Sequence, residues 1–218
     1  MVRQQNGLCV LRFLAGRLCL DFVNSIENRA GNKPDDFLTS YSDVVRWGQH
    51  RDLLSDADAE RLLTLADQQP GMATVALDVV LALRETLHRV FLALAREDEP
   101  AAGDLGHIQG IYGRAIGHAR FHRSDGRFEW TWPVDVTQLD WPLWPIAHSA
   151  VKLLTEGDPE RVKVCANPDG CGWLFYDGSK NGSRRWCSME GCGSQVKMRR
   201  QYAKQRNAQR GARDVGDL

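Results

Sequence analysis

Four of the six cysteines lie close together near the C-terminus, at Cys165, Cys171, Cys187 and Cys192. Their spacing, C-x5-C-x15-C-x4-C, supplies two short-range pairs joined by a longer loop, as four thiolates around a tetrahedral zinc ion require. A segment this short cannot bury a sizeable core of its own, so a metal would replace most of that core. This cluster constrains the fold of the C-terminal region more than any other feature of the chain.

Two other uses of the cysteines are a disulfide staple and a redox centre. The cluster holds no Cys-x-x-Cys redox pair. The first 22 residues contain only short apolar runs, broken by Arg12 and Arg17, so we expect neither a secretory signal nor a membrane span. We therefore expect a cytoplasmic protein, in whose reducing compartment clustered cysteines hold a metal rather than form disulfides. The expected cofactor is Zn²⁺ and the expected ligands are these four cysteines.

The residues around the cysteines predict the order knuckle, hairpin and helix, which is the plan of a treble-clef finger. Residues 162–164 should form a strand that leads into a knuckle at Pro168-Asp169-Gly170, and the hairpin should contain Trp173, Phe175 and Tyr176. Cys187 should precede a helix whose first turn contains Cys192 and whose cap is Ser188. We expect Trp173 and Trp186 to pack around the zinc rather than to stack on a ligand.

Charge is distributed unevenly along a chain whose formal net charge is zero. Residues 1–160 carry 16 Lys and Arg against 23 Asp and Glu, whereas residues 161–213 carry 12 against 3. The composition changes near Gly157, so we expect an N-terminal domain at 1–157, a zinc finger at 158–210 and a tail at 211–218. An acidic domain joined to a basic module indicates a polyanionic partner for the module.

The N-terminal domain is expected to be mainly helical. Helices are predicted at 41–50, from Ser55 to near Pro70, at about 72–97, at 103–119 and at about 144–156; the longest has apolar residues at steps of three and four. Residues 18–29 predict either a strand or a helical turn. Gly106, Gly110, Gly113 and Gly117 in the 103–119 helix could let another helix approach closely.

Alternating aromatic residues on either side of Asp125-Gly126 predict a β-hairpin at 120–132. The expected fold class is therefore a mainly α N-terminal domain with a small β-hairpin, followed by a small α+β treble-clef zinc finger.

Cys165, Cys171, the stretch "GWLFYDGSKNGSRRWCSMEGCG" and the basic segment behind it resemble the CGNR-type zinc finger. In that family the finger follows an ABATE-like domain, described as a stress-induced transcription regulator, and "LCLDFVNS" and "LRETLHRVF" are similar to its patterns. The resemblance covers nearly the whole chain and implies a treble-clef zinc site in a DNA-binding transcription regulator. In place of Cys-Gly-Asn-Arg, however, this chain has Cys192-Gly193-Ser194-Gln195, which keeps the ligand and changes the residues behind it.

The cations of the finger are expected to bind duplex DNA. On a helix, Lys197, Arg200 and Lys204 share one face and Arg199 lies on a second one. With Lys180, Arg184 and Arg185 of the preceding loop they suit phosphate contacts, and Ser194 and Gln195 could reach base edges in the major groove. The alternatives are a solvated basic surface, an RNA-binding finger or a protein-interaction finger.

No catalytic motif stands out, and His148 is the last histidine, far from the finger, so we expect no enzyme activity. The N-terminal domain should then either bind a small-molecule effector or form a homodimer. Asp21 and Asn24 lie on an otherwise apolar stretch, and Arg84 lies on the apolar helix. These three residues either line a small-molecule pocket or make internal capping contacts.

Overall fold

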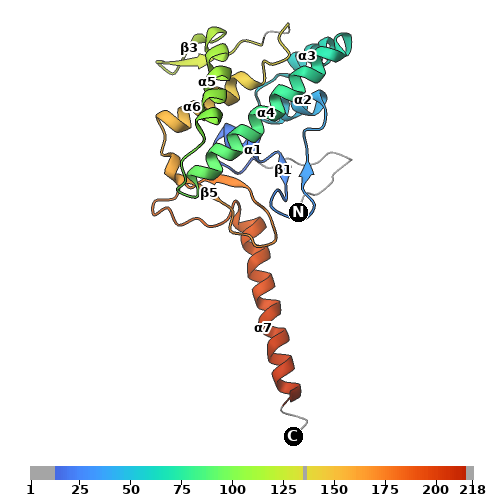
Figure 1. The fold of residues 1–218 in the computed structure, drawn as a ribbon, viewed down its shortest axis with the longest axis vertical. Helices are drawn as coiled ribbons and strands as arrows, with labels where there is room; N and C mark the ends of the chain where they lie inside the picture. Colours follow the sequence, from blue (N-terminus) through green and yellow to red (C-terminus); the bar gives the residue numbers. More distant parts are fainter. Residues whose placement is uncertain (1–12, 135–136, 215–218) are drawn as a thin grey trace.

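The computed structural model describes residues 13–134 and 137–214, with side chains up to residue 206 in the last helix. A helical body is followed by a small finger, from which a single helix extends away from the rest of the molecule (Figure 1). The helices of the body are α1 (Leu18–Val23), α2 (Tyr41–His50), α3 (Asp56–Gln68), α4 (Pro70–Leu94), α5 (Ala102–Gly117) and α6 (Leu143–Thr155). The order of elements agrees with the expected mainly α domain.

Helix α4 is the centre of the body and contacts α1, α2, α3, α5 and α6. Its apolar stripe includes Val80, Leu83, Leu87 and Val90, whose side chains are fully buried. This three- and four-residue periodicity places one continuous face of the helix against the core. The 72–97 prediction therefore identified the right helix, although the helix begins at Pro70, which occupies the favoured first position.

Side-chain caps fix the starts of α2 and α3. Ser55, where this helix was expected to begin, accepts a hydrogen bond from the Asp58 backbone N–H. At α2, Ser40 and Asp43 form a complete capping box, because the side chain of each accepts from the backbone N–H of the other. The sequence analysis predicted the range of α2 but not this cap.

Residues 18–29, which predicted either a strand or a helical turn, form both. Helix α1 is almost wholly buried and is followed by β1 (Ile26–Glu27), which pairs antiparallel with β2 (Asp35–Asp36). The predicted hairpin is present as β3 (Arg120–Ser124) and β4 (Arg127–Thr131), with Phe121 opposite Trp130. Asp125 and Gly126 both have positive φ, at 50° and 79°, as a type I′ turn requires.

The glycines of α5 do not serve the predicted helix approach, and that prediction is wrong. A Cβ atom built on Gly106, Gly110, Gly113 or Gly117 would meet no atom within 4 Å. Helix α5 packs against α6 and α4 instead, and buries Ile108, Ile111 and Ala115 on the face away from the glycines.

The finger contains the short 3₁₀ turn η1 (Pro159–Arg161), β5 (Val162–Val164), β6 (Leu174–Tyr176), the π-helical turn η2 (Met189–Gly193) and α7 (Ser194–Asp214). Strands β5 and β6 pair antiparallel and pack on α1 and α4, so that Val162 and Leu174 belong to the same core as the body. Helix α7 continues beyond the predicted end at residue 210, into the predicted tail, whose residues 215–218 lie outside the described structure. Among the described residues, no helix is long and apolar enough to span a bilayer.

Candidate metal centre and nucleic-acid interface

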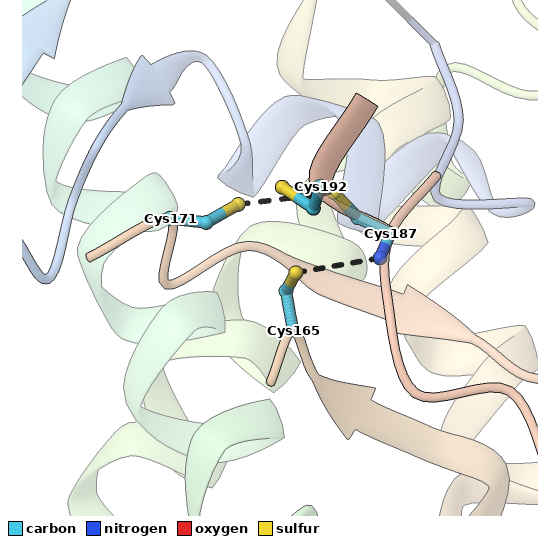
Figure 2. Close-up of side chains that lie close together, drawn as sticks. All are labelled: Cys165, Cys171, Cys187 and Cys192. Atoms are coloured by element: carbon cyan, nitrogen blue, oxygen red, sulfur yellow. Dashed lines mark hydrogen bonds between the residues drawn. The ribbon is translucent and has the colours of Figure 1, made fainter. Parts of the chain in front are cut away.

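The four cysteine side chains point toward one another (Figure 2). Their Sγ atoms all lie within 4.8 Å of one another, and Cys187 Sγ is 3.7 Å from Cys171 Sγ and 3.6 Å from Cys192 Sγ. Four sulfurs at about 2.3 Å from a tetrahedral zinc would be about 3.8 Å apart, so these separations fit the ion. The thiols are free, as a metal site needs.

Two elements bring the cysteines together. Cys165 directly follows β5, and its backbone N–H donates to the Trp173 carbonyl oxygen at 2.8 Å, which closes the first knuckle toward Cys171. In the second knuckle, Ser188 Oγ accepts from the Gly191 N–H at 3.1 Å and caps η2, which contains Cys192. The Cys187 N–H donates to Cys165 Sγ at 3.4 Å and joins the two knuckles (Figure 2). The predicted knuckle, hairpin and cap are all present.

The electrostatics of the thiols also favour a cation. Hydrogen bonds from the thiols of Cys171 and Cys187 lower the pKa of Cys165, whereas the contact with Cys165 raises the pKa of Cys187. One thiolate is therefore stabilised by its neighbours, but further thiolates in so small a volume repel it. A divalent zinc ion removes this repulsion and allows all four sulfurs to bind it as thiolates.

A buried amide supports the metal centre from behind. Asn167 Nδ2 lies 3.4 Å from Cys192 Sγ and 3.3 Å from Gln195 Oε1, and Asn167 Oδ1 accepts from the Asp169 N–H at 3.1 Å. Such contacts hold a ligand sulfur in position. Gln195, which stands where the related finger has Arg, therefore belongs to this hydrogen-bond network through its carbonyl oxygen. The sequence analysis did not single out Asn167, although Asn-Pro-Asp-Gly is a recognisable turn signal.

The two finger tryptophans pack beside the cysteines, as expected. Trp173 also links the finger to the body, because its indole Nε1 donates to the Ile26 carbonyl oxygen at 2.9 Å.

The first half of the finger is joined to the body through backbone groups as well. The Asn24 side chain pairs with both polar groups of one β6 residue: its Nδ2 donates to the Leu174 carbonyl oxygen at 2.7 Å, and its Oδ1 accepts from the Leu174 N–H at 3.0 Å. The Tyr176 N–H donates to the Ala15 carbonyl oxygen at 2.8 Å. At Gly170, a Cβ atom would lie 2.5 Å from Gly31 Cα, so only glycine fits where the knuckle meets the body.

Asp21, Asn24 and Arg84 all have internal partners. Asp21 accepts from the Ala15 N–H and pairs with Arg51, and the Arg84 guanidinium pairs with Asp36 and Glu85. The bonds of Asn24 are those to β6. These are structural contacts between elements of the fold.

Asp177 is a fully buried carboxylate that organises the loop after β6. It accepts from Lys163 Nζ at 2.7 Å, from the Ser179 N–H and hydroxyl at 3.0 and 2.6 Å, and from the Arg184 N–H at 2.9 Å. Burial opposes its ionisation, but these hydrogen bonds outweigh burial and hold the pKa of Asp177 well below its usual range. Sequence reasoning missed this residue, although Asp177-Gly178-Ser179 is a turn signal.

The predicted DNA-binding cations fall into two groups. The Arg184 guanidinium donates to the carbonyl oxygens of Trp186 at 2.9 Å, Leu14 at 3.1 Å and Cys187, and it lies over the Phe175 ring. Arg199 pairs with Asp169 of the first knuckle. The other five predicted DNA-binding cations are exposed and make no ion pair with any described residue: Lys180, Arg185, Lys197, Arg200 and Lys204. The sequence placed Arg184 at the surface, whereas its internal donors identify it as a structural residue.

The helical body, the four-cysteine centre and the basic helix together define the class of protein. It is a zinc-binding protein with a large helical N-terminal domain and a small zinc finger. Residues 16–157 match the family model ABATE, described as "Putative stress-induced transcription regulator", and residues 161–205 match the CGNR zinc finger. The chain therefore belongs to the ABATE family and carries a CGNR zinc finger. A search among curated proteins finds no match to it. The two family descriptions indicate a zinc-binding regulator.

Proposed function

We propose that this protein is a transcription regulator whose zinc finger binds duplex DNA. The observation that carries the proposal is α7, a helix anchored at Cys192 that projects from the molecule with unpaired cations (Figure 1). A helix of 21 residues is about 30 Å long, enough to lie along a major groove.

The composition of α7 supports a polyanionic partner. Its side chains from Lys197 to Arg206 are exposed, including the apolar Met198 and Tyr202 at 54% and 66%. An isolated helix that buries so little of itself is only marginally stable in water, because most helix stability in proteins comes from packing. Neutralisation of the cations by phosphate would remove their mutual repulsion and stabilise the helix.

One face of α7 is the best candidate for phosphate contacts. Lys197, Arg200 and Lys204 line a groove of about 430 Å³ whose floor includes Trp186 and Val196. Three cations at helical spacing can follow one strand of a duplex backbone.

Contacts with bases are assigned to the start of α7. Ser194 Oγ donates to the Met189 carbonyl oxygen at 3.0 Å, while Gln195 Oε1 accepts from Asn167. The Gln195 amide NH₂ keeps its donors for a base edge, and we expect a single donating contact there rather than the bidentate pair with adenine.

The body would serve the same regulator as a sensor of a small molecule or as a dimerisation unit, with no catalytic step of its own. We also propose that the protein acts in the cytoplasm.

The test is duplex binding by the zinc-loaded protein, measured by fluorescence anisotropy over a range of salt concentrations. Lys197→Ala, Arg200→Ala and Lys204→Ala should each weaken binding to every duplex and make the log–log salt slope less steep by about one. The matched control is Arg114→Ala in α5, an exposed arginine of the body, which should leave the slope unchanged. Unchanged affinity in the triple α7 variant would contradict the proposal.

RNA is the second candidate, and a competition decides it. If single-stranded or duplex RNA of equal length displaces the DNA at lower concentration, the finger is an RNA-binding module and the assignment to DNA is wrong.

A further inference from the structure

A cavity of about 770 Å³ lies in the body between α5, α6, strand β4 and the start of α1. Its aromatic wall is formed by Tyr112, Phe128, Trp130, Trp132 and His148. This volume is in the range that holds a small organic ligand. Aromatic walls favour a flat apolar group, which can stack on them.

His148 contributes a flat ring to this aromatic wall. Its ring stacks on Tyr112 with centroids 5.9 Å apart and lies 4.9 Å from the Trp132 ring. Its Nδ1 is buried and has no hydrogen-bond partner among the described residues. Because this atom is shielded from solvent, His148 contributes the face of its ring to the cavity wall and not a hydrogen bond.

Two cations also line the cavity. Arg17 comes from the N-terminus of α1 and Lys152 from α6, and neither forms an ion pair with a described residue. The carboxylates that also line the cavity, Glu129 and Glu156, are exposed to solvent, as Lys152 is, so solvent screens all three charges; Arg17 is half-buried and is screened less. Arg17 therefore gives the cavity a site for an anion, which a guanidinium binds with two parallel hydrogen bonds.

We propose that this cavity binds a small aromatic carboxylate. The ring lies against Trp130, Trp132 and His148, and the carboxylate meets Arg17 and Lys152. The site is separate from Asp21, Asn24 and Arg84, whose polar groups are used inside the fold.

Arg17 also connects the cavity to the finger. Its guanidinium carbon lies 3.8 Å from the centroid of the Tyr176 ring in β6, and its Nη1 donates to the Gly16 carbonyl oxygen at 2.8 Å. A carboxylate that engages Arg17 withdraws it from Tyr176, which is hydrogen-bonded to Ala15 beside it. The ligand thereby loosens β6, the strand that docks the finger on the body. An effect of this loosening on DNA binding rests on the proposed function, whereas the loosening itself does not.

Binding is tested by isothermal calorimetry on the full-length, zinc-loaded protein without DNA. The probes are indole-3-acetate, the uncharged indole-3-acetamide and the cationic tryptamine. The acid should bind at least tenfold more tightly than the amide and the amine. Lys152→Gln and Trp130→Ala should each weaken the acid about tenfold, whereas the control Lys180→Gln in the finger loop should not. Equal binding of amine and acid, or no heat with any probe, overturns the proposal.

The connection between the cavity and the finger through Arg17 is tested on the same protein by hydrogen exchange and by one further variant. Indole-3-acetate should speed exchange of the Tyr176 amide while the amides of α4 keep their protection. Because coupling between sites is reciprocal, Tyr176→Leu should free Arg17 and tighten the acid severalfold. An unchanged affinity in Tyr176→Leu, with unchanged exchange, overturns the role of Arg17. Neither measurement involves DNA, so its outcome does not depend on whether the finger binds DNA.

Discussion

The zinc finger contains cations of two kinds, and the structural ones lie mainly in its first half. In the first half, from η1 to Trp186, Lys163 binds the buried Asp177 and Arg184 binds main-chain carbonyl oxygens. In the second half, Lys197, Arg200 and Lys204 extend from α7 without an acidic partner among the described residues. A basic segment can thus contain charges that hold the fold and charges that are free for a ligand, and a count of lysines and arginines does not distinguish them.

The two halves also differ in what stabilises them. Strands β5 and β6 share the core of the body and exchange hydrogen bonds with it through Asn24 and Ala15. Turn η2 and helix α7 are connected to the rest mainly through Cys187, Cys192 and the Asn167 network. Loss of zinc should therefore affect the two halves unequally.

Zinc removal should have the largest effect of all the changes that test this difference. Chelation, or Cys187→Ser, should release η2 and α7 and abolish duplex binding, since structural zinc contributes on the order of 10 kcal/mol in isolated finger peptides. Strand β6 should stay docked. Hydrogen exchange resolved along the chain measures both. The control is Cys19→Ala, a buried cysteine of the body outside the cluster, which should keep the full zinc content. Equal loss of protection in both halves would show that zinc, not the body, holds the hairpin.

Asn24→Ala should have the next largest effect on stability, and this effect should fall on the first half of the zinc finger. It leaves the N–H and C=O of Leu174 buried without partners, at about 1–3 kcal/mol each. Urea unfolding followed by tryptophan fluorescence measures the loss of stability. Gln49→Ala, which removes an exposed side-chain contact with Asp56, is the control and should cost less than about 0.5 kcal/mol. A similarly small cost for Asn24→Ala would mean that the hairpin is not held by this pairing.

The pH dependence of stability should come in part from Asp177. Its folded pKa is lowered, so the folded state binds fewer protons than the unfolded one at acid pH. The stabilisation is complete above the unfolded pKa of about 3.9 and is lost as the pH falls below it. Asp177→Asn should lower stability at pH 7 by about 2–3 kcal/mol and abolish this part of the acid loss.

The measurement is the difference in unfolding free energy between wild type and Asp177→Asn from pH 2.5 to 7, in which effects common to both proteins cancel. Asp67→Asn on the exposed face of α3 is the matched control. A difference that does not shrink below pH 4 would contradict the role of the Asp177 carboxylate.

The smallest expected effects separate two adjacent arginines. Arg184→Ala should lower the stability of the finger by about 1–3 kcal/mol, because it removes the donors of several main-chain carbonyl oxygens, and it should leave the salt slope of duplex binding unchanged. Arg185→Ala should leave stability within about 0.5 kcal/mol and reduce the slope. Thermal unfolding and fluorescence anisotropy are measured on both variants. If Arg185→Ala lowered stability and Arg184→Ala reduced the salt slope, the structural and DNA-binding roles of the two arginines would be reversed.

Much of this molecule could be predicted from local sequence. The range of α2, the cap of α3, the turn at Asp125-Gly126 and the capping role of Ser188 depend on residues a few positions apart, where propensity and hydrogen-bonding geometry decide. The glycines of α5 were misread because periodicity does not say which face meets a neighbour. The aromatic cavity was missed because its wall comes from separate elements, α5, β4 and α6.

The sequence alone determined the metal chemistry, since the spacing of four cysteines allows few other arrangements, and it determined the uneven distribution of charge. Only the tertiary structure decided which polar residues serve the fold. Asn24 and Leu174 are 150 positions apart, and Arg184 reaches Leu14 across 170. Such partners are chosen by the packing of the finger on the body, and a buried donor or acceptor must find them wherever the chain brings them.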